Sequence, residues 1–226
     1  MSAGLDLCVE KLVHAVSDGS ERKTLLNIEE LKIPSGTHCV LKGASGSGKT
    51  TFLRLISGIA APSSGVIRWG QTDVTRLGAG ERDRWRGKNV GFLFQDFRLF
   101  EGLTALENVL LPCGFYARVT QKDRKRAQEL LETVGVCPTT RTANLSRGEM
   151  QRTALARLLM TKPKVILADE PTASLDTENA RHVLDLLMQS AHDSGATLIV
   201  ASHDPTTMSR IERCLTVKNE TVFFEN

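Results

Sequence analysis

A glycine-rich stretch early in the chain constrains the fold more than any other feature. Residues 43–51 read GASGSGKTT; the apolar run 39–41 precedes them, and a helix-like run, 52–56, follows. Strand, glycine loop, lysine and helix in this order form the G-x-x-x-x-G-K-[ST] pattern of a phosphate-binding loop in the context that the pattern requires. The alternative is a glycine-rich turn that binds nothing, and the presence of both the lysine and the threonine favours phosphate binding.

The chemistry of this loop follows from its geometry. Successive backbone N–H groups of such a turn point into one concavity that accepts phosphate oxygens, and the dipole of the following helix adds positive charge. Lys49 is expected to reach the β- and γ-phosphates, and Thr50 to offer its hydroxyl to Mg²⁺. We therefore expect a nucleoside triphosphate to contact Gly43, Ser45, Gly46, Ser47, Gly48, Lys49, Thr50 and Thr51.

The bulk composition is that of an ordinary globular chain. Its 226 residues suit one domain with room for a subdomain, and 41% of them are hydrophobic. A formal net charge of +3 is too small to indicate a nucleic-acid partner by itself. The five cysteines are scattered without a C-x-x-C pair, which argues against a zinc site and suits a reducing cytosol.

Membrane-crossing segments are not expected from the sequence. Residues 1–10 lack the basic region and apolar run of a signal peptide. No apolar stretch approaches the ~20 residues that a membrane-spanning helix needs. If the protein acts at a membrane, we expect a partner to hold it there.

Apolar patterning predicts the elements along the chain. Alternation over 5–10, followed by the segments 31–33 and 38–41, predicts a small antiparallel sheet that leads into the glycine loop. Other strands are expected at 66–69, 90–94, 164–168, 197–201 and 215–224; of these, 164–168 and 197–201 have the continuous apolar character of buried parallel strands. Helices are expected after the capping patterns that begin at Thr120 and Ser146 and over 179–191, whereas 81–88 is interpreted as a charged surface segment.

Strands and helices that alternate after a phosphate-binding loop imply an α/β fold with a mainly parallel sheet. Ligands bind such sheets at the carboxyl ends of the strands. Each of four polar residues lies at or just past such an end: Lys49, Gln95, Asp169 and His203. We therefore expect groups from distant parts of the chain to converge on one site.

Polar residues at this expected site suggest distinct roles. Asp169 follows a hydrophobic strand and is the expected carboxylate on the Mg²⁺ side of the phosphates, while Glu170 is the expected general base for the attacking water. The alternative is that both carboxylates merely cap the next turn. His203 is expected to donate to the γ-phosphate or to hold Glu170 in place, although a lone histidine after a strand is more often structural. The Gln95 amide could ligate both Mg²⁺ and the attacking water, although a glutamine that ends a strand is usually solvated.

Ser146 begins a second pattern of interest. Ser146 and Glu149 form the S-x-x-E pattern of a capping box, which predicts a helix start. The same helix N-terminus, with Gly148 allowing close approach, is a second anion site. A single chain offers no second phosphate for it, whereas two chains arranged head to tail could each offer this site to the other's γ-phosphate.

These motifs, in this order, resemble those of the ATP-binding-cassette (ABC) ATPases. The matching segments are 43–51 (Walker A), Gln95 (Q-loop), 145–149 (signature), 165–170 (Walker B), 174–176 (D-loop) and His203 (H-loop). The resemblance covers essentially the whole chain. It implies ATP as substrate and Mg²⁺ as cofactor, with Glu170, His203 and Gln95 in catalysis, Thr50, Gln95 and Asp169 at the metal, and Ser146 and Gly148 on the partner's nucleotide.

The resemblance also implies an architecture. A single ABC ATPase domain is expected over 1–226, with a P-loop NTPase (RecA-like) core at 1–94 and 160–226. An N-terminal antiparallel β subdomain belongs to this core, and an α-helical subdomain is inserted at approximately 95–159.

A narrower likeness lies in the segments VGFLFQDFRLF (90–100) and LTALENV (103–109) and in Pro112. They are similar to the branch that contains the macrolide exporter MacB, the lipoprotein-release ATPase LolD and the cell-division ATPase FtsE. This likeness implies a cytoplasmic subunit held on the inner face of the cell membrane by an integral-membrane permease. It also implies an ATP-dependent homodimer around two MgATP and a groove near 95–112 that receives a permease helix; no nucleic acid is expected.

Two positions depart from the family pattern. Val16 stands where such cassettes usually stack the adenine on an aromatic residue, so we expect weaker or less selective nucleotide binding. Arg147 stands where the signature usually has glycine, so we expect a working but altered contact. Two other functions are considered: a soluble cassette ATPase that acts on DNA or ribosomes, and a non-catalytic module gated by nucleotide.

Overall fold

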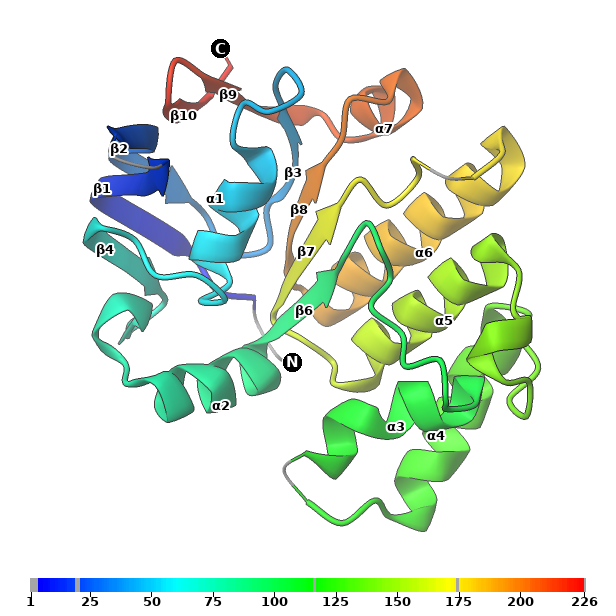
Figure 1. Cartoon of the computed structure of the whole chain (residues 1–226). Coiled ribbons are helices and arrows are strands. Elements are labelled where there is room, and N and C mark those ends of the chain that lie inside the picture. The colour runs from blue at the N-terminus through cyan, green and yellow to red at the C-terminus, as the bar shows by residue number, and fades with distance from the viewer. Residues whose placement is uncertain (1–3, 19–20, 116, 174, 226) are drawn as a thin grey trace.

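A six-stranded sheet forms the centre of the molecule (Figure 1). The computed structural model describes residues 4–18, 21–115, 117–173 and 175–225. The strand order is β10-β9-β3-β8-β7-β6, and all neighbours are parallel except β10 and β9. The six strands are β3 (His38–Lys42), β6 (Val90–Leu93), β7 (Val165–Asp169), β8 (Thr197–Ala201), β9 (Arg213–Lys218) and β10 (Thr221–Phe224).

The apolar strands predicted at 164–168 and 197–201 are confirmed, because β7 and β8 are buried along their whole length. Side chains alternate between the two faces of the sheet. On β3, Val40 points into one hydrophobic core, while Cys39 and Leu41 belong to the other. Continuous apolar sequence is therefore what a strand between two cores requires.

A second, antiparallel sheet has the strand order β2-β1-β4-β5. It contains β1 (Leu7–Asp18), β2 (Glu21–Ile33), β4 (Ser64–Trp69) and β5 (Thr72–Asp73). The prediction of an N-terminal antiparallel β region is thus confirmed. Its first two strands are longer than predicted because β1 continues past Lys11, whose φ is 48°, and through a bulge at His14/Ala15 that breaks the simple alternation of side chains.

One strand assignment was wrong. The segment 38–41 was expected in the antiparallel sheet, but β3 pairs in parallel with β8 and β9, with Val40 opposite Val200 and Cys214. The reason is burial: residues 39–41 face hydrophobic cores on both sides, which only a central strand satisfies. Because β3 and β7 are parallel to β8, the glycine loop after β3 lies at the same end of the sheet as the residues that follow β7.

Helices occupy most of the remaining described chain. They are α1 (Lys49–Ile56), α2 (Ala79–Asn89), α3 (Ala105–Gly114), α4 (Gln121–Thr133), α5 (Arg147–Met160), α6 (Thr177–Ser194) and α7 (Pro205–Arg210), with short 3₁₀ turns at Val74–Arg76 and Thr142–Asn144. Both predicted capping boxes are present, at Thr120 before α4 and at Ser146 before α5. The charged segment 81–88 lies at the surface as predicted, within α2.

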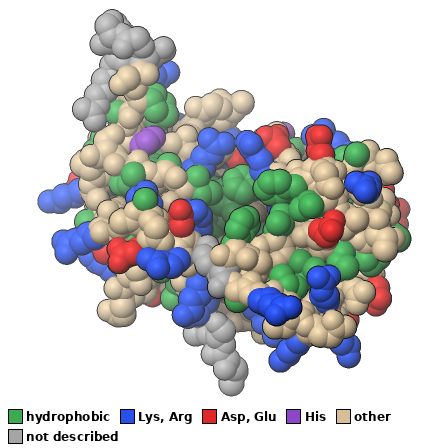
Figure 2. Space-filling model, turned by 60° about the horizontal axis from the view of Figure 1, so that its bottom comes forward, with side chains coloured by type: hydrophobic (Ala, Val, Ile, Leu, Met, Phe, Trp, Pro, Cys, Tyr) green, Lys and Arg blue, Asp and Glu red, His purple; other side chains and the backbone are tan. Residues whose placement is uncertain are grey.

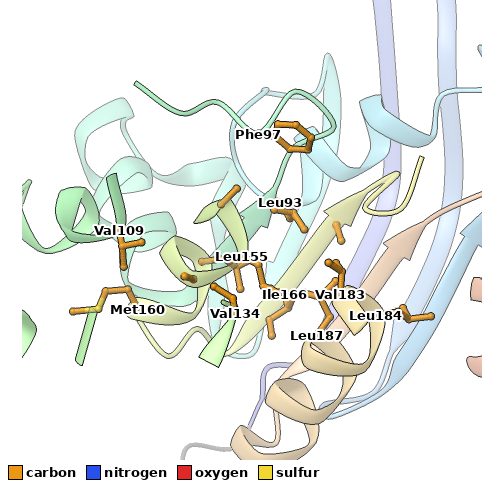
Figure 3. Packing of buried hydrophobic residues seen from close by; sticks show 14 of the residues in the cluster. Leu93, Phe97, Val109, Val134, Leu155, Met160, Ile166, Val183, Leu184 and Leu187 are labelled. Carbon is orange, nitrogen blue, oxygen red and sulfur yellow. The ribbon is translucent and has the colours of Figure 1, made fainter. Parts of the chain in front are cut away.

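The helices cover the two faces of the central sheet differently (Figure 1). On one face, α1 and the antiparallel sheet enclose one core. On the other, α5 and α6 pack against the sheet, and α3 and α4 pack beyond them. Figure 3 shows this second core, where Leu93 and Ile166 of the sheet lie with Leu155 of α5 and Val183 and Leu187 of α6. No helix in the described ranges combines the length and the apolar character needed to cross a membrane.

Candidate active site

A cavity opens at the carboxyl ends of the parallel strands. It is lined by the loop after β3 and by residues that follow the other strands, in full Leu25, Gly43, Ala44, Ser45, Gly46, Gly48, Lys49, Thr50, Thr51, Gln95, Asp169, Glu170, Ala173 and His203. Strand register explains the convergence, because Leu93 lies opposite Ala168, and Asp169 lies opposite Ala201. The structure therefore brings together Lys49, Gln95, Asp169 and His203, as expected from the sequence.

The glycine loop is shaped by close packing and by left-handed backbone at two glycines, Gly46 and Gly48. A Cβ on Gly43 would lie 2.6 Å from Ser47 Oγ and 2.8 Å from the Val217 carbonyl oxygen, so no larger residue fits. Gly48 has a φ of 104° at the N-cap of α1, a conformation that L side chains rarely adopt. Gly48 has no side chain that could cap α1. The first backbone N–H groups of the helix, which lie at the cavity, therefore have no side-chain acceptor at the N-cap.

The donors of the loop fit a phosphate group. Lys49 Nζ donates to the carbonyl oxygens of Gly43 and Ala44, at 2.8 and 3.2 Å. Ser47 Oγ is buried and has no hydrogen-bond partner among the described residues. Buried polar atoms in proteins are nearly always paired. Ser47 itself is not among the residues that line the cavity, unlike the other predicted residues of the loop.

Thr50 and Asp169 form the next part of the site. Thr50 Oγ1 donates to Asp169 Oδ1 at 3.1 Å, across 119 positions of sequence. Asp169 is 5% exposed, and burial raises the pKa of its carboxyl, with the neighbouring Glu170 charge adding to the effect and Thr50 opposing it. A buried carboxylate beside a hydroxyl is a fitting pair of oxygen ligands for a hard cation.

A cation at this position would need ligands from the substrate as well. Within the described ranges, no group of three or more His, Cys, Asp or Glu side chains could hold a metal ion. Mg²⁺ is usually bound by one or two carboxylates together with substrate phosphates and water, so this donor set fits a metal that arrives with a triphosphate.

Glu170 and His203 are in direct contact. His203 Nδ1 lies 2.9 Å from Glu170 Oε1, which favours the expectation that this histidine holds the glutamate. The backbone of Glu170 is left-handed, with a φ of 48°, and its N–H donates to the Ala201 carbonyl at 2.9 Å. Such a conformation in a non-glycine residue costs of the order of 1–3 kcal/mol and concentrates at functional sites.

The alternative role for the two carboxylates, capping of the next turn, finds no support in the hydrogen bonds. The following helix, α6, is capped by Asp176, whose carboxylate accepts from the N–H groups of Glu178 and Asn179. Of the predicted D-loop segment 174–176, Ser174 lies outside the described residues.

The Ser146 turn lies apart from this cavity. Ser146 Oγ accepts from the Glu149 N–H at 3.3 Å and donates to Glu149 Oε2 at 2.6 Å, which closes the capping box. Neither Ser146 nor Gly148 lines the cavity formed by the same chain. The prediction that this turn contacts the nucleotide of a second chain stays a prediction.

Sequence reasoning missed two residues next to the site. Phe97 and Arg157 hold the loop that follows Gln95, and neither was singled out from the sequence. The sequence could have indicated Arg157, because this cation lies in the apolar part of α5. A charge that is buried there needs strong hydrogen-bond partners. Val16, by contrast, is 37% exposed on β1 and does not line the cavity, which receives Leu25 of β2 instead.

Comparison with known families gives one consistent result. Residues 26–173 match the family model described as ABC transporter. The chain is 34% identical to the lipoprotein-releasing system ATP-binding protein LolD of Legionella pneumophila (strain Paris), over 96% of both chains. It is 37% identical to the uncharacterized ABC transporter ATP-binding protein YvrO of Bacillus subtilis (strain 168), over 89% of this chain and 88% of YvrO.

Solved structures agree with the sequence comparisons. The fold matches the dimeric post-hydrolysis state of the ATP-binding cassette MJ0796 bound to ADP and Pi, with a TM-score of 0.90 and 32% identity, covering 97% of this chain and 98% of that one. It also matches cbiO1 from Clostridium perfringens, part of the ABC transporter complex cbiONQ, with a TM-score of 0.81 and 27% identity over 97% and 87% of the two chains.

Proposed function

The chain belongs to the ABC transporter family, and from that premise we propose that it binds MgATP and hydrolyses the ATP to drive an integral-membrane permease. One observation carries the proposal: a phosphate-binding loop, the Thr50–Asp169 pair and the Glu170–His203 pair line a single cavity. The non-catalytic alternative lacks a reason for this last pair, which holds a carboxylate at the place where hydrolysis needs a base.

The chain's own residues would bind and orient the triphosphate. The backbone of 43–51 and Ser47 would surround the phosphate oxygens, and the Lys49 ammonium would exchange its two carbonyl partners for the β- and γ-phosphates. Thr50, Gln95 and Asp169 would hold Mg²⁺, which when bound neutralises charge on the phosphates.

Glu170 and His203 would promote the attack of water. Glu170 would accept the proton of the attacking water, which Gln95 helps to orient. His203 would keep the Glu170 carboxylate in place through the 2.9 Å contact and lie near the γ-phosphate. Most of the rate enhancement in phosphoryl transfer comes from such positioning and from electrostatic stabilisation.

Two copies of the chain would complete each other's sites. The Ser146 turn cannot reach the cavity of its own chain, and the dimeric MJ0796 structure shows that a similar cassette associates in pairs. We assign the core to 1–94 and 160–226, and the inserted helical subdomain to approximately 95–159. Closing on two nucleotides would move these helical subdomains and whatever is docked on them.

A permease would dock near residues 95–112. Phe100 in this segment is 56% exposed and Phe115 just beyond it is 71% exposed, so both rings are free to pack against a partner. Figure 2 shows hydrophobic side chains gathered in the middle of one face, with charged side chains of both signs around them. Such a partner would hold the chain at the cytoplasmic face of the membrane, and the similarity to LolD makes lipoprotein release or export the nearest precedent.

The soluble alternative, an ATPase acting on DNA or ribosomes, is not favoured. The relatives named above are transporter subunits, and a net charge of +3 provides no basic surface for nucleic acid by itself.

Co-purification tests the proposed partner. The Glu170→Gln chain, purified with MgATP from solubilised membranes, is expected to retain a stoichiometric membrane protein, because the variant cannot hydrolyse ATP and release the closed state. Glu132→Gln, an exposed change on α4, is the charge-matched control. Recovery of soluble proteins or nucleic acid in place of a membrane protein would overturn the permease proposal and support the soluble alternative.

A further inference from the structure

We propose that Arg147 and Phe97 are positioning residues that join the loop after Gln95 to the first turn of α5. Through this contact, a nucleotide that binds at Gln95 in one chain would also orient the turn 146–148 that the chain offers to its partner. The inference rests on the proposed function, and it assigns a role to the arginine that replaces the usual glycine.

The first observation is the contact itself. The guanidinium carbon of Arg147 lies 5.5 Å from the centroid of the Phe97 ring, within the range of a cation–π interaction. Phe97 is 7% exposed, and its ring belongs to the core that α5 shares with the central sheet (Figure 3). The ring is therefore a fixed platform on which an exposed arginine is held.

Helix stability does not explain an arginine at this position. Arg147 is the first residue of α5, where the helix dipole is positive and a cation is unfavourable. The negative face of an aromatic ring offsets this repulsion. The side chain is thus placed where it links two segments at some cost to the helix end.

The second observation is a further anchor between the same two segments. Phe97 and Arg98 are consecutive non-glycine residues with left-handed backbones, at φ values of 59° and 50°. Arg157, also on α5, donates Nη2 to the Phe97 carbonyl at 2.5 Å and Nη1 to the Arg98 carbonyl at 2.6 Å. Burial lowers the pKa of Arg157 to about 10, which still leaves it charged at neutral pH.

The two contacts, through Arg157 and Arg147, connect the loop after Gln95 to both ends of α5. Arg157 fixes the backbone of the loop to the last turn of α5, and Arg147 ties the Phe97 ring to the first turn of the same helix. Gln95 lies two residues before Phe97 and lines the cavity, while Ser146 and Gly148 flank Arg147. A shift of Gln95 on nucleotide binding would thus be transmitted to the turn that faces the second chain.

The test measures ATP-dependent dimerisation by sedimentation in the Glu170→Gln background. Phe97→Leu and Arg147→Met are each expected to raise the ATP concentration at half-maximal dimer by about two- to fivefold, the range of an exposed cation–π contact. The double variant should be no worse than either single variant, since both remove one interaction. Phe97→Tyr keeps the ring and should behave as the parent, as should Arg124→Met, a matched loss of one exposed charge on α4.

Two results would overturn the inference: effects of Phe97→Leu and Arg147→Met that multiply independently, or a Phe97→Tyr variant as impaired as Phe97→Leu. If the Glu170→Gln parent itself fails to dimerise with ATP, the proposed function fails instead. Hydrogen exchange without nucleotide then still tests the contact, because amides of residues 147–150 should exchange about two- to fivefold faster in Phe97→Leu and unchanged in Phe97→Tyr. Equal exchange in all variants would contradict it.

Discussion

At the scale of single residues, the site concentrates groups that the fold alone would not favour. The Asp169 carboxyl is buried, and Ser47 has a buried hydroxyl without a partner among the described residues. Glu170 has a left-handed backbone. Each is costly in the free chain, and the proposed binding of MgATP gives the Asp169 carboxyl and the Glu170 backbone a function that offsets this cost. The residues of the site are therefore optimised for the ligand more than for stability.

Neutralising Asp169 should stabilise the nucleotide-free protein. Burial raises the folded-state pKa of this carboxyl, so its ionisation lowers the free energy of unfolding as pH rises from the unfolded pKa through the folded one. Asp169→Asn removes the charge, and its Tm at neutral pH should rise by up to a few degrees, since about 1 kcal/mol shifts the Tm of a domain this size by roughly 2–4 °C.

The same variant should lose the rise in Tm that MgATP gives the natural chain, because a carboxylate ligand is missing. Thermal melts with and without MgATP measure both effects, and Asp6→Asn, an exposed Asp-to-Asn change before β1, serves as the control. A lower Tm for Asp169→Asn without nucleotide would contradict this account of the site.

An aromatic residue at position 16 should tighten nucleotide binding. Stacking of an aromatic pair contributes about 0.5–1.5 kcal/mol beyond burial, which corresponds to roughly a two- to twelvefold lower Kd. Val16→Tyr is expected to gain such a factor for ATP in a fluorescence titration, and Val16→Leu, which adds bulk without a ring, is not. Equal affinities for all three chains would show that the adenine lies elsewhere, for example against Leu25, which lines the cavity.

At the scale of elements, local patterns were sufficient wherever one segment determined its own structure. The glycine loop, the buried strands β7 and β8, and the capping boxes before α4 and α5 were predicted from neighbouring residues. The partners of β3 and the roles of Phe97 and Arg157 were not, because they depend on segments far apart in the chain. Apolar alternation identifies a strand, but it carries no record of which sheet the strand joins.

Variants of the two capping boxes, at Ser146 and Thr120, should distinguish an effect on stability from an effect on catalysis. Ser146→Ala and Thr120→Ala each remove an N-cap and should each cost about 1 kcal/mol of stability. ATP hydrolysis should fall strongly in Ser146→Ala but persist in Thr120→Ala, because α4 has no assigned contact with nucleotide. Urea unfolding and ATPase assays measure the two effects; similar activity in both variants would remove the Ser146 turn from the mechanism.

The Ser146 box should also respond to acid. Hydrogen bonds from the Ser146 hydroxyl and backbone N–H lower the pKa of Glu149, so the box stabilises α5 above the unfolded pKa of Glu149. This contribution is lost as pH falls through the lower, folded pKa.

At the scale of the whole molecule, the site is incomplete in a single chain. One cavity contains the loop, the carboxylates and His203, while the Ser146 turn does not line it and, in the function proposed here, serves the nucleotide of a second copy. Association should therefore depend on the nucleotide. Glu170→Gln is expected to sediment as a dimer with MgATP and as a monomer with MgADP, whereas Glu132→Gln should turn over ATP and return to the monomer. If Glu170→Gln is a dimer with both nucleotides, or a monomer with both, this arrangement is contradicted.

Lys49 gives the loop a way to recover after each turnover. In the free chain its ammonium already has two carbonyl acceptors on its own loop, at 2.8 and 3.2 Å. When the inorganic phosphate leaves, these two carbonyl oxygens can accept the hydrogen bonds that the Lys49 ammonium had made to the phosphate. The loop thereby competes with its own product, which should shorten the residence time of the phosphate and favour re-opening of the pair.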